Sequence, residues 1–92
     1  MKYLDWDKAK NERLKAEREI SFEDIVNAID SGYLLKTLDN LNQAKYPGQK
    51  MYIVNINNYV YVVPFVEDKE KRFLKTIFPS RKMTEKYIIK EK

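Results

Sequence analysis

The stretch Met51–Val66, which reads MYIVNINNYVYVVPFV, decides the fold class. It contains two apolar runs on either side of Asn57-Asn58, a pair of residues suited to a tight hairpin turn. The pattern predicts a strand over Met51–Ile56 and a return strand over Tyr59–Val66. One face of the return strand carries Tyr59, Tyr61, Val63 and Phe65, and the other carries Val60, Val62 and Val66. A sheet that is apolar on both faces needs cover on both.

Two helices are predicted before the hairpin. Asp7 is a candidate N-cap for a charged helix that runs to about Arg18. Ser21 and Asp24 have the spacing of a capping box and begin a second helix with apolar residues at helical spacing. Gly32 ends it, because glycine adopts the left-handed cap conformation at little cost. These helices can cover one face of the hairpin. A partner protein, the C-terminal segment or a second copy of the chain would cover part of the other.

Shorter elements surround this core. Tyr3–Trp6 is a candidate edge strand, and Tyr33–Leu38 is either a strand or an extension of the second helix. Asp39–Gly48 is polar and is predicted to be a loop. The downstream elements are a charged turn at Glu67–Lys71, a strand over Arg72–Phe78 that Pro79 ends, and a short helix over Thr84–Lys90.

Length and composition indicate one domain over residues 1–92, because 92 residues with 43% apolar content build a single core. The expected class is α+β, in the order β-α-α-β-β-β with a short C-terminal helix. In this fold the N-terminal helices pack on an antiparallel sheet of three to four strands.

The composition excludes several kinds of chemistry. The chain has no cysteine and no histidine, so disulfides, thiol nucleophiles, Cys/His zinc sites and a histidine general base are ruled out. Its two glycines cannot form a glycine-rich phosphate loop. The paired carboxylates lack the pattern of a metal site, so neither a metal nor a cofactor is expected. No apolar run is long enough to span a membrane and no signal-peptide core follows the N-terminus, so a cytoplasmic location is expected.

The charge is unevenly distributed along the chain. The net charge is +4, and residues 69–92 alone carry nine basic against three acidic residues, a balance of +6. A basic segment in a chain with seven tyrosines suits an anionic partner, with RNA or DNA ahead of a membrane surface. A solvated lysine-rich surface accounts for the same composition.

The stretch from Lys75 to Lys82 is the candidate site. Lys75, Arg81 and Lys82 could gather around a phosphate, with Ser80 adding a hydroxyl. In metal-free RNA cleavage the 2′-OH attacks the adjacent phosphate, and such cations stabilise the added negative charge. Without histidine, lysine, tyrosine, a carboxylate or water would transfer the protons. The alternative is that these bases only line the rim of the sheet.

The tyrosines of the return strand have two interpretations. Tyr59 and Tyr61 share a strand face and could stack on RNA bases. They could equally be core or interface residues, and Tyr52 and Tyr87 are expected to be packing residues.

Short motifs at both ends of the chain suggest a family. Trp6-Asp7, Lys10 and Ile20-Ser21-Phe22-Glu23 resemble the W-D-x-x-K and K-H-G-[VI]-S-F-E-[ED] motifs that open BrnT-type toxins. Ser80-Arg81-Lys82 is similar to the S-A-R-[KR] ending of that family. The K-T-I-x-P-S-R-K string, present at residues 75–82, is shared with a group of small bacterial proteins described as toxins. Residues 33–50 match nothing specific.

The resemblance implies a RelE-like fold and a ribonuclease toxin of a type II toxin–antitoxin pair that cleaves RNA without a metal. A small antitoxin, often with a ribbon-helix-helix DNA-binding domain, would neutralise it, and operator DNA would be bound only through the antitoxin. Carried over by position, four residues match family motifs: Lys10, Ser80, Arg81 and Lys82. Lys75 lies near the position at which the family has an arginine in a strand. A homodimer is also compatible with the pattern.

One departure favours a second hypothesis. The family's K-H-G becomes Glu17-Arg18-Glu19, so arginine replaces a histidine and cannot act as a base near neutral pH. Arg18 would then contribute to RNA binding only through its positive charge. The alternative function is a non-catalytic interaction module, a degenerate toxin that binds an antitoxin-like partner or nucleic acid.

Overall fold

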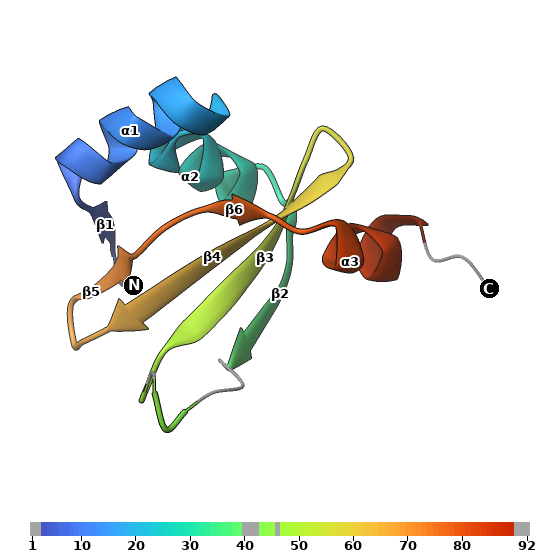
Figure 1. The fold of residues 1–92 in the computed structure, drawn as a ribbon. Helices are drawn as coiled ribbons and strands as arrows, with labels where there is room; N and C mark the ends of the chain where they lie inside the picture. Colours follow the sequence, from blue (N-terminus) through green and yellow to red (C-terminus); the bar gives the residue numbers. More distant parts are fainter. Residues whose placement is uncertain (1–2, 40–42, 46, 90–92) are drawn as a thin grey trace.

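The computed structural model describes residues 3–39, 43–45 and 47–89, and it forms an α+β fold around one mixed sheet (Figure 1). The sheet has the strand order β1-β5-β4-β3-β2, and β6 pairs with β4 beyond the end of β5. The elements are β1 (Tyr3–Trp6), α1 (Lys8–Arg18), α2 (Phe22–Asp30), β2 (Leu34–Asp39), β3 (Lys50–Ile56), β4 (Tyr59–Glu67), β5 (Lys71–Leu74), β6 (Phe78–Pro79), α3 (Arg81–Thr84) and the π-helical turn η1 (Glu85–Ile89).

The predicted helix starts are confirmed. Asp7 caps α1, and its side chain accepts hydrogen bonds from the backbone amides of Ala9 and Lys10. Ser21 and Asp24 form the reciprocal capping box at the start of α2. Gly32 follows the end of α2 with φ +91°. The edge-strand prediction for Tyr3–Trp6 is also confirmed, as β1.

The predicted hairpin is present with the expected turn. β3 and β4 pair antiparallel in a register that sets Ile56 opposite Tyr59. Asn57 and Asn58 have φ of 55° and 63°, the left-handed pair that a two-residue hairpin turn requires. Residues 34–39 form strand β2, which pairs with β3. Of the two alternatives predicted for Tyr33–Leu38, the strand is therefore correct and the extension of the second helix is not. The loop predicted over Asp39–Gly48 includes residues 40–42 and 46, which lie outside the described residues.

The prediction of a purely antiparallel sheet with three to four strands is wrong. The strands β1 and β5 run parallel, with Tyr3 opposite Lys71, and the β1–α1–α2 segment makes that arrangement possible by returning the chain across the sheet. The sheet is therefore mixed, and β1 forms one of its edges.

The strand predicted over Arg72–Phe78 is instead two short strands. β5 ends at Leu74, which pairs with Phe65. The next residue of β4 is Pro64, whose carbonyl accepts from the Lys75 N–H at 2.8 Å. Because proline has no N–H to return, the ladder stops there. Pairing resumes only at Phe78, opposite Val62.

The predicted C-terminal helix begins earlier than expected. Ser80 is its N-cap, and its hydroxyl accepts from the Met83 N–H at 3.2 Å, so helical structure starts at Arg81 rather than Thr84. The predicted end at Lys90 lies outside the described residues. This segment packs on the face of the hairpin opposite α1 and α2. Of the three candidates for covering that face (a partner protein, the C-terminal segment or a second copy), the C-terminal segment therefore covers it.

Two apolar clusters lie on the two sides of the sheet. The larger joins α1 and α2 to the inner faces of β3, β4 and β5, with Phe22, Ile25 and Phe65 fully buried. The smaller contains Ile53, Val60 and Val62, against which Met83, Tyr87 and Ile88 of the C-terminal segment pack. Tyr52 is buried in the larger cluster, so the packing roles expected for Tyr52 and Tyr87 are confirmed. None of the described helices is long and apolar enough to cross a membrane.

Candidate nucleic-acid interface

A groove beside α1 brings basic residues from two parts of the chain together. It has a volume of about 100 Å³ and is lined by Lys10, Arg13, Leu14, Glu17, Arg18 and Thr76, a set called here the α1 groove. The Arg18 guanidinium donates to the carbonyl of Ile77 at 2.5 Å, which ties the end of α1 to the segment between β5 and β6. Two predicted RNA-binding residues, Lys10 and Arg18, therefore lie at one concave site.

A second basic group lies on the C-terminal segment and consists of Arg81, Lys82 and Lys86, called here the tail cations. Their side chains are exposed, and the Arg81 side chain, at 86% exposure, makes a single long contact of 3.6 Å, with Glu85, among the residues that the structure describes. Exposed pairs of this kind contribute little to stability and leave the guanidinium open to a ligand. Ser80 serves as the N-cap, so its hydroxyl already accepts one backbone hydrogen bond.

The structure anchors Lys75 and the segment that carries Arg81 and Lys82 at separate points of β4, and their convergence on one phosphate stays a prediction. The backbone amides of Lys75 and Ser80 donate to Pro64 and Val60 respectively, four residues apart on β4. At the rise of a strand these anchor points are roughly 14 Å apart. The Lys75 ammonium lies over the Phe73 ring, 5.7 Å from its centroid, on the β5 side of its anchor. The Lys75 ammonium is therefore held beside β5, whereas Arg81 and Lys82 follow the second anchor point.

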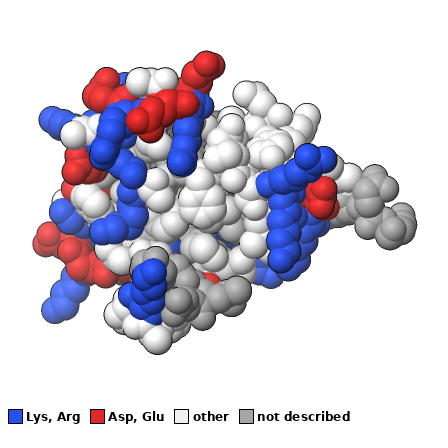
Figure 2. Space-filling view, in the orientation of Figure 1, with Lys and Arg blue, Asp and Glu red and all other residues white. Residues whose placement is uncertain are grey.

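Figure 2 shows basic side chains at α1, interleaved with acidic ones, and the tail cations on the same face of the molecule, with uncharged surface between the two groups. β6 crosses this uncharged region in the same orientation (Figure 1). β6 contains Phe78, which is 38% exposed. The face thus presents two basic groups on either side of a strand with an exposed aromatic residue, an arrangement suited to a single-stranded nucleic acid.

Two further bases of the C-terminal half are engaged in structural contacts. Arg72 donates to Glu67 and to the Tyr52 hydroxyl, both at 2.8 Å, and these hydrogen bonds raise its pKa. Lys71 lies 3.3 Å from Asp5. That contact raises the pKa of Lys71, and the pKa of Asp5 is lowered by a hydrogen bond from the Trp6 amide and then by Lys71. Lys71 and Arg72 hold β5 to its neighbours. The net charge of +6 over residues 69–92 therefore overstates the positive charge that is available to a ligand.

Tyr61 has a different environment from the one expected of an RNA-stacking residue. It is half-buried and lines a pocket that also contains the carboxylates of Glu19 and Asp24. Its ring makes an edge contact with Tyr59 at a centroid distance of 6.0 Å. Carboxylates repel phosphates, so this surrounding disfavours Tyr61 as an RNA contact.

Sequence reasoning missed Arg13, Glu17 and Thr76 as members of one site. Arg13 lies three residues after Lys10, and that helical spacing could have placed both on one face. Nothing in the sequence indicated that Thr76 would lie beside α1, because this contact depends on the path of the chain after Pro64 stops the ladder. Among the described residues no group of three or more acidic, histidine or cysteine side chains could hold a metal ion.

Comparison with protein-family models, with curated proteins and with solved structures found no match to this chain.

Proposed function

We propose that this protein binds RNA across the face formed by the α1 groove, β6 and the tail cations. The observation that carries the proposal is the presence of two separate basic groups on one face, joined by uncharged surface that β6, with its exposed residue Phe78, crosses. Phosphates of one strand contact both groups, and a base stacks on the aromatic ring between them.

The proposal extends to a RelE-like fold and a BrnT-type ribonuclease toxin of a type II toxin–antitoxin pair. The order of elements, one strand, two helices, five further strands and a short helical tail, supports it. A second support is Glu19, which has φ 56° at the end of α1. The family motif carries glycine at this position, and glycine is the residue that a left-handed conformation favours. The alignment of the motif therefore agrees with the backbone.

The α1 groove is the proposed position of the scissile phosphate, because it combines cations and a carboxylate in one concavity. Lys10, Arg13 and Arg18 hold the phosphate oxygens. Glu17 accepts the proton of the 2′-OH while the 2′ oxygen bonds to phosphorus. The bond from phosphorus to the 5′ oxygen then breaks, and water protonates the leaving oxygen. The products are a 2′,3′-cyclic phosphate and a 5′-hydroxyl.

The remaining bases have supporting roles in this proposal. Arg81 and Lys82 hold a second phosphate of the same strand, and Lys75 adds charge beside Phe73. The partner is a small antitoxin, with operator DNA bound only through it, and the setting is cytoplasmic. A homodimer stays a separate expectation that size-exclusion measurements address.

The test uses purified, partner-free protein with total RNA in excess EDTA. Glu17→Gln should lower the cleavage rate by about 100-fold or more while RNA affinity is retained, since a general base supplies that much. Arg81→Ala/Lys82→Ala should weaken binding and reduce the slope of log affinity against log salt by about 0.7, the value for the one phosphate that these two residues hold. Lys36→Ala/Lys69→Ala removes the same charge elsewhere and should change the slope much less. Equal slopes for the two double variants would overturn the proposed RNA path.

A second candidate function is the non-catalytic interaction module. It is favoured by one observation, that Arg18, in place of the family's histidine, donates to a backbone carbonyl and cannot move a proton. RNA that stays intact in EDTA, is bound with the predicted salt dependence, and leaves translation running would select the module. Growth arrest that a neighbouring antitoxin relieves would select the toxin.

A further inference from the structure

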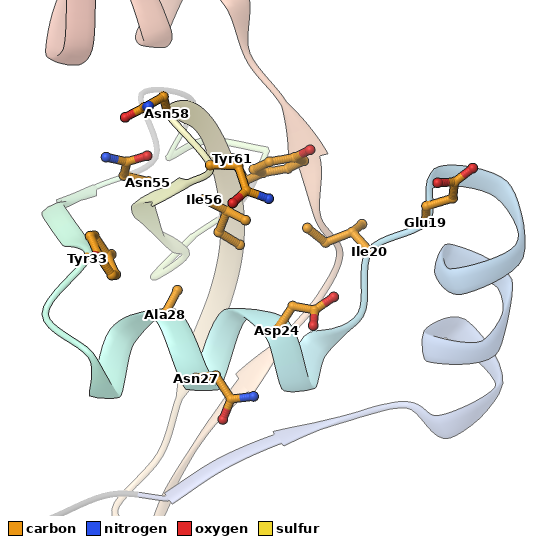
Figure 3. Close-up of a pocket in the computed structure, with 11 residues that line it drawn as sticks. Glu19, Ile20, Asp24, Asn27, Ala28, Tyr33, Asn55, Ile56, Asn58 and Tyr61 are labelled. Carbon is orange, nitrogen blue, oxygen red and sulfur yellow. The ribbon is translucent and has the colours of Figure 1, made fainter.

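A second and larger pocket lies between α2 and the tip of the β3–β4 hairpin, with a volume of about 530 Å³ (Figure 3). Asp24 comes from α2, Asn55 and Asn58 come from the hairpin on the opposite side, Glu19 lies at one end and Tyr33 at the other. Tyr61 forms part of the wall. We refer to this site as the acidic pocket.

The acidic pocket contrasts in charge with the rest of the protein. The chain carries +4, yet the lining of this pocket contains two carboxylates and no lysine or arginine. One oxygen of Asp24 accepts from the Ser21 amide at 3.0 Å, and Glu19 makes no ion pair with any described residue. A lining with two carboxylates and no basic side chain favours a cationic occupant and repels a phosphate.

The walls of the pocket are held by backbone hydrogen bonds. The Tyr33 amide donates to the carbonyl of Ala28 and the Tyr33 carbonyl accepts from the Asn55 amide, both at 2.9 Å. Tyr33 lies at the rim and is 52% exposed, and its backbone is therefore hydrogen-bonded to both walls of the pocket. A rim of this kind is preorganised, which lowers the entropic cost of binding.

Two features at this pocket carry a local energetic cost. Glu19 adopts the left-handed conformation that glycine would adopt without strain. The side-chain oxygen of Asn55 is buried and has no hydrogen-bond partner among the described residues. A donor delivered by a ligand, with a rotation of the amide, would satisfy that acceptor.

From these features we infer that the acidic pocket binds an arginine side chain presented by a basic segment of a protein partner. A guanidinium supplies five donors and no acceptor, which matches two carboxylates and the amide oxygens. Its planar face stacks on tyrosine, which Tyr33 and Tyr61 offer. This inference is independent of RNA cleavage, since the pocket has a separate lining from the α1 groove.

The test titrates isotope-labelled protein with N-acetyl-arginine amide and follows the side-chain amide resonances of Asn55 and Asn58 by NMR. N-acetyl-citrulline amide has nearly the same shape without the charge, and adenosine monophosphate probes for a nucleotide site. Arginine amide should shift the resonances saturably, and the citrulline analogue should bind about tenfold or more weakly. Equal binding of the citrulline analogue, or tighter binding of the nucleotide, would overturn the inference.

Variants at Glu19 separate a binding defect from a folding defect. Glu19→Gln should weaken arginine binding by about threefold to fivefold, as the loss of one partly exposed charge pair does. Glu12→Gln, on the same helix but outside the pocket, should leave binding unchanged. Glu19→Gly should also weaken binding while the melting temperature rises by a few degrees, because the backbone strain is removed. Full binding by both Glu19 variants would contradict the assignment.

Discussion

The two sides of the central sheet are built differently. On one side two helices bury an extended cluster that includes Leu14, Phe22 and Ile25. On the other side a short tail covers three buried residues, Ile53, Val60 and Val62. The helix side has its own caps and apolar periodicity, whereas the tail is held by a few specific hydrogen bonds to β4. Similar apolar strand faces are thus covered by very different amounts of structure, and we expect the tail to open at a lower free energy than the helices.

Matched isoleucine deletions should give the largest effects and should distinguish the two sides. Ile25 and Ile53 are both fully buried, one beneath the helices and one beneath the tail. Ile25→Ala should lower the free energy of unfolding by about 3–4 kcal/mol, and Ile53→Ala by about 2 kcal/mol. The smaller cost follows because a short tail can settle into the cavity. Urea denaturation measures both, and equal losses would show that the tail is as rigid as the helices.

Removal of Asn11 should break the link between the two helices. Asn11 is buried, accepts from the Phe22 amide and donates to Glu23 Oε1, both at 2.8 Å. Asn11→Ala leaves a buried N–H unpaired and should cost about 2–3 kcal/mol. Glu12→Ala, at the next position of α1, is the control and should cost less than about 0.5 kcal/mol. Thermal unfolding followed by circular dichroism compares them.

Thr84 holds the tail to the sheet. Its hydroxyl accepts from the Val60 amide at 2.9 Å and donates to the Ser80 carbonyl at 2.7 Å. Thr84→Val should cost about 1–2 kcal/mol, because the Val60 N–H loses its partner. Thr84→Ser keeps the hydroxyl and should retain most of the stability. Hydrogen exchange at the Val60 amide should accelerate in the valine variant, while amides of α2 stay protected. Uniform acceleration would mean that the tail does not open separately.

The smallest expected effect is on how the free energy of unfolding depends on pH, through Glu23 at the start of α2. The hydrogen bond from Asn11 lowers the pKa of Glu23 below its ordinary value of 4.5. The charged carboxylate therefore contributes stability above pH 4.5, and this contribution is lost as the pH falls through the lower folded-state pKa. Glu23→Gln should flatten the stability curve below pH 4.5. In the Asn11→Ala background the same substitution should have little effect, and a persisting difference would point to another partner.

Much of the fold could be predicted because local patterns agreed with one another. The Asn57-Asn58 turn, the Ser21 capping box and the Asp7 N-cap depend on residues close in sequence, so each was recognisable from spacing alone. The candidate site was less accessible. Lys10 and Arg18 were identified, yet their neighbour Thr76 was not, and Arg81 and Lys82 were expected beside Lys75 although the chain path separates them.

The sequence by itself determined the helix starts, the hairpin and the apolar character of both strand faces, since these depend on local sterics and side-chain alternation. Tertiary structure alone decided which segment covers the second face, that β1 runs parallel to β5, and which charges become neighbours. Those outcomes depend on contacts between residues far apart in the chain. The stop at Pro64 illustrates the difference, because a proline in one strand ended its partner strand and so separated the backbone of Lys75 from the segment that carries Arg81 and Lys82.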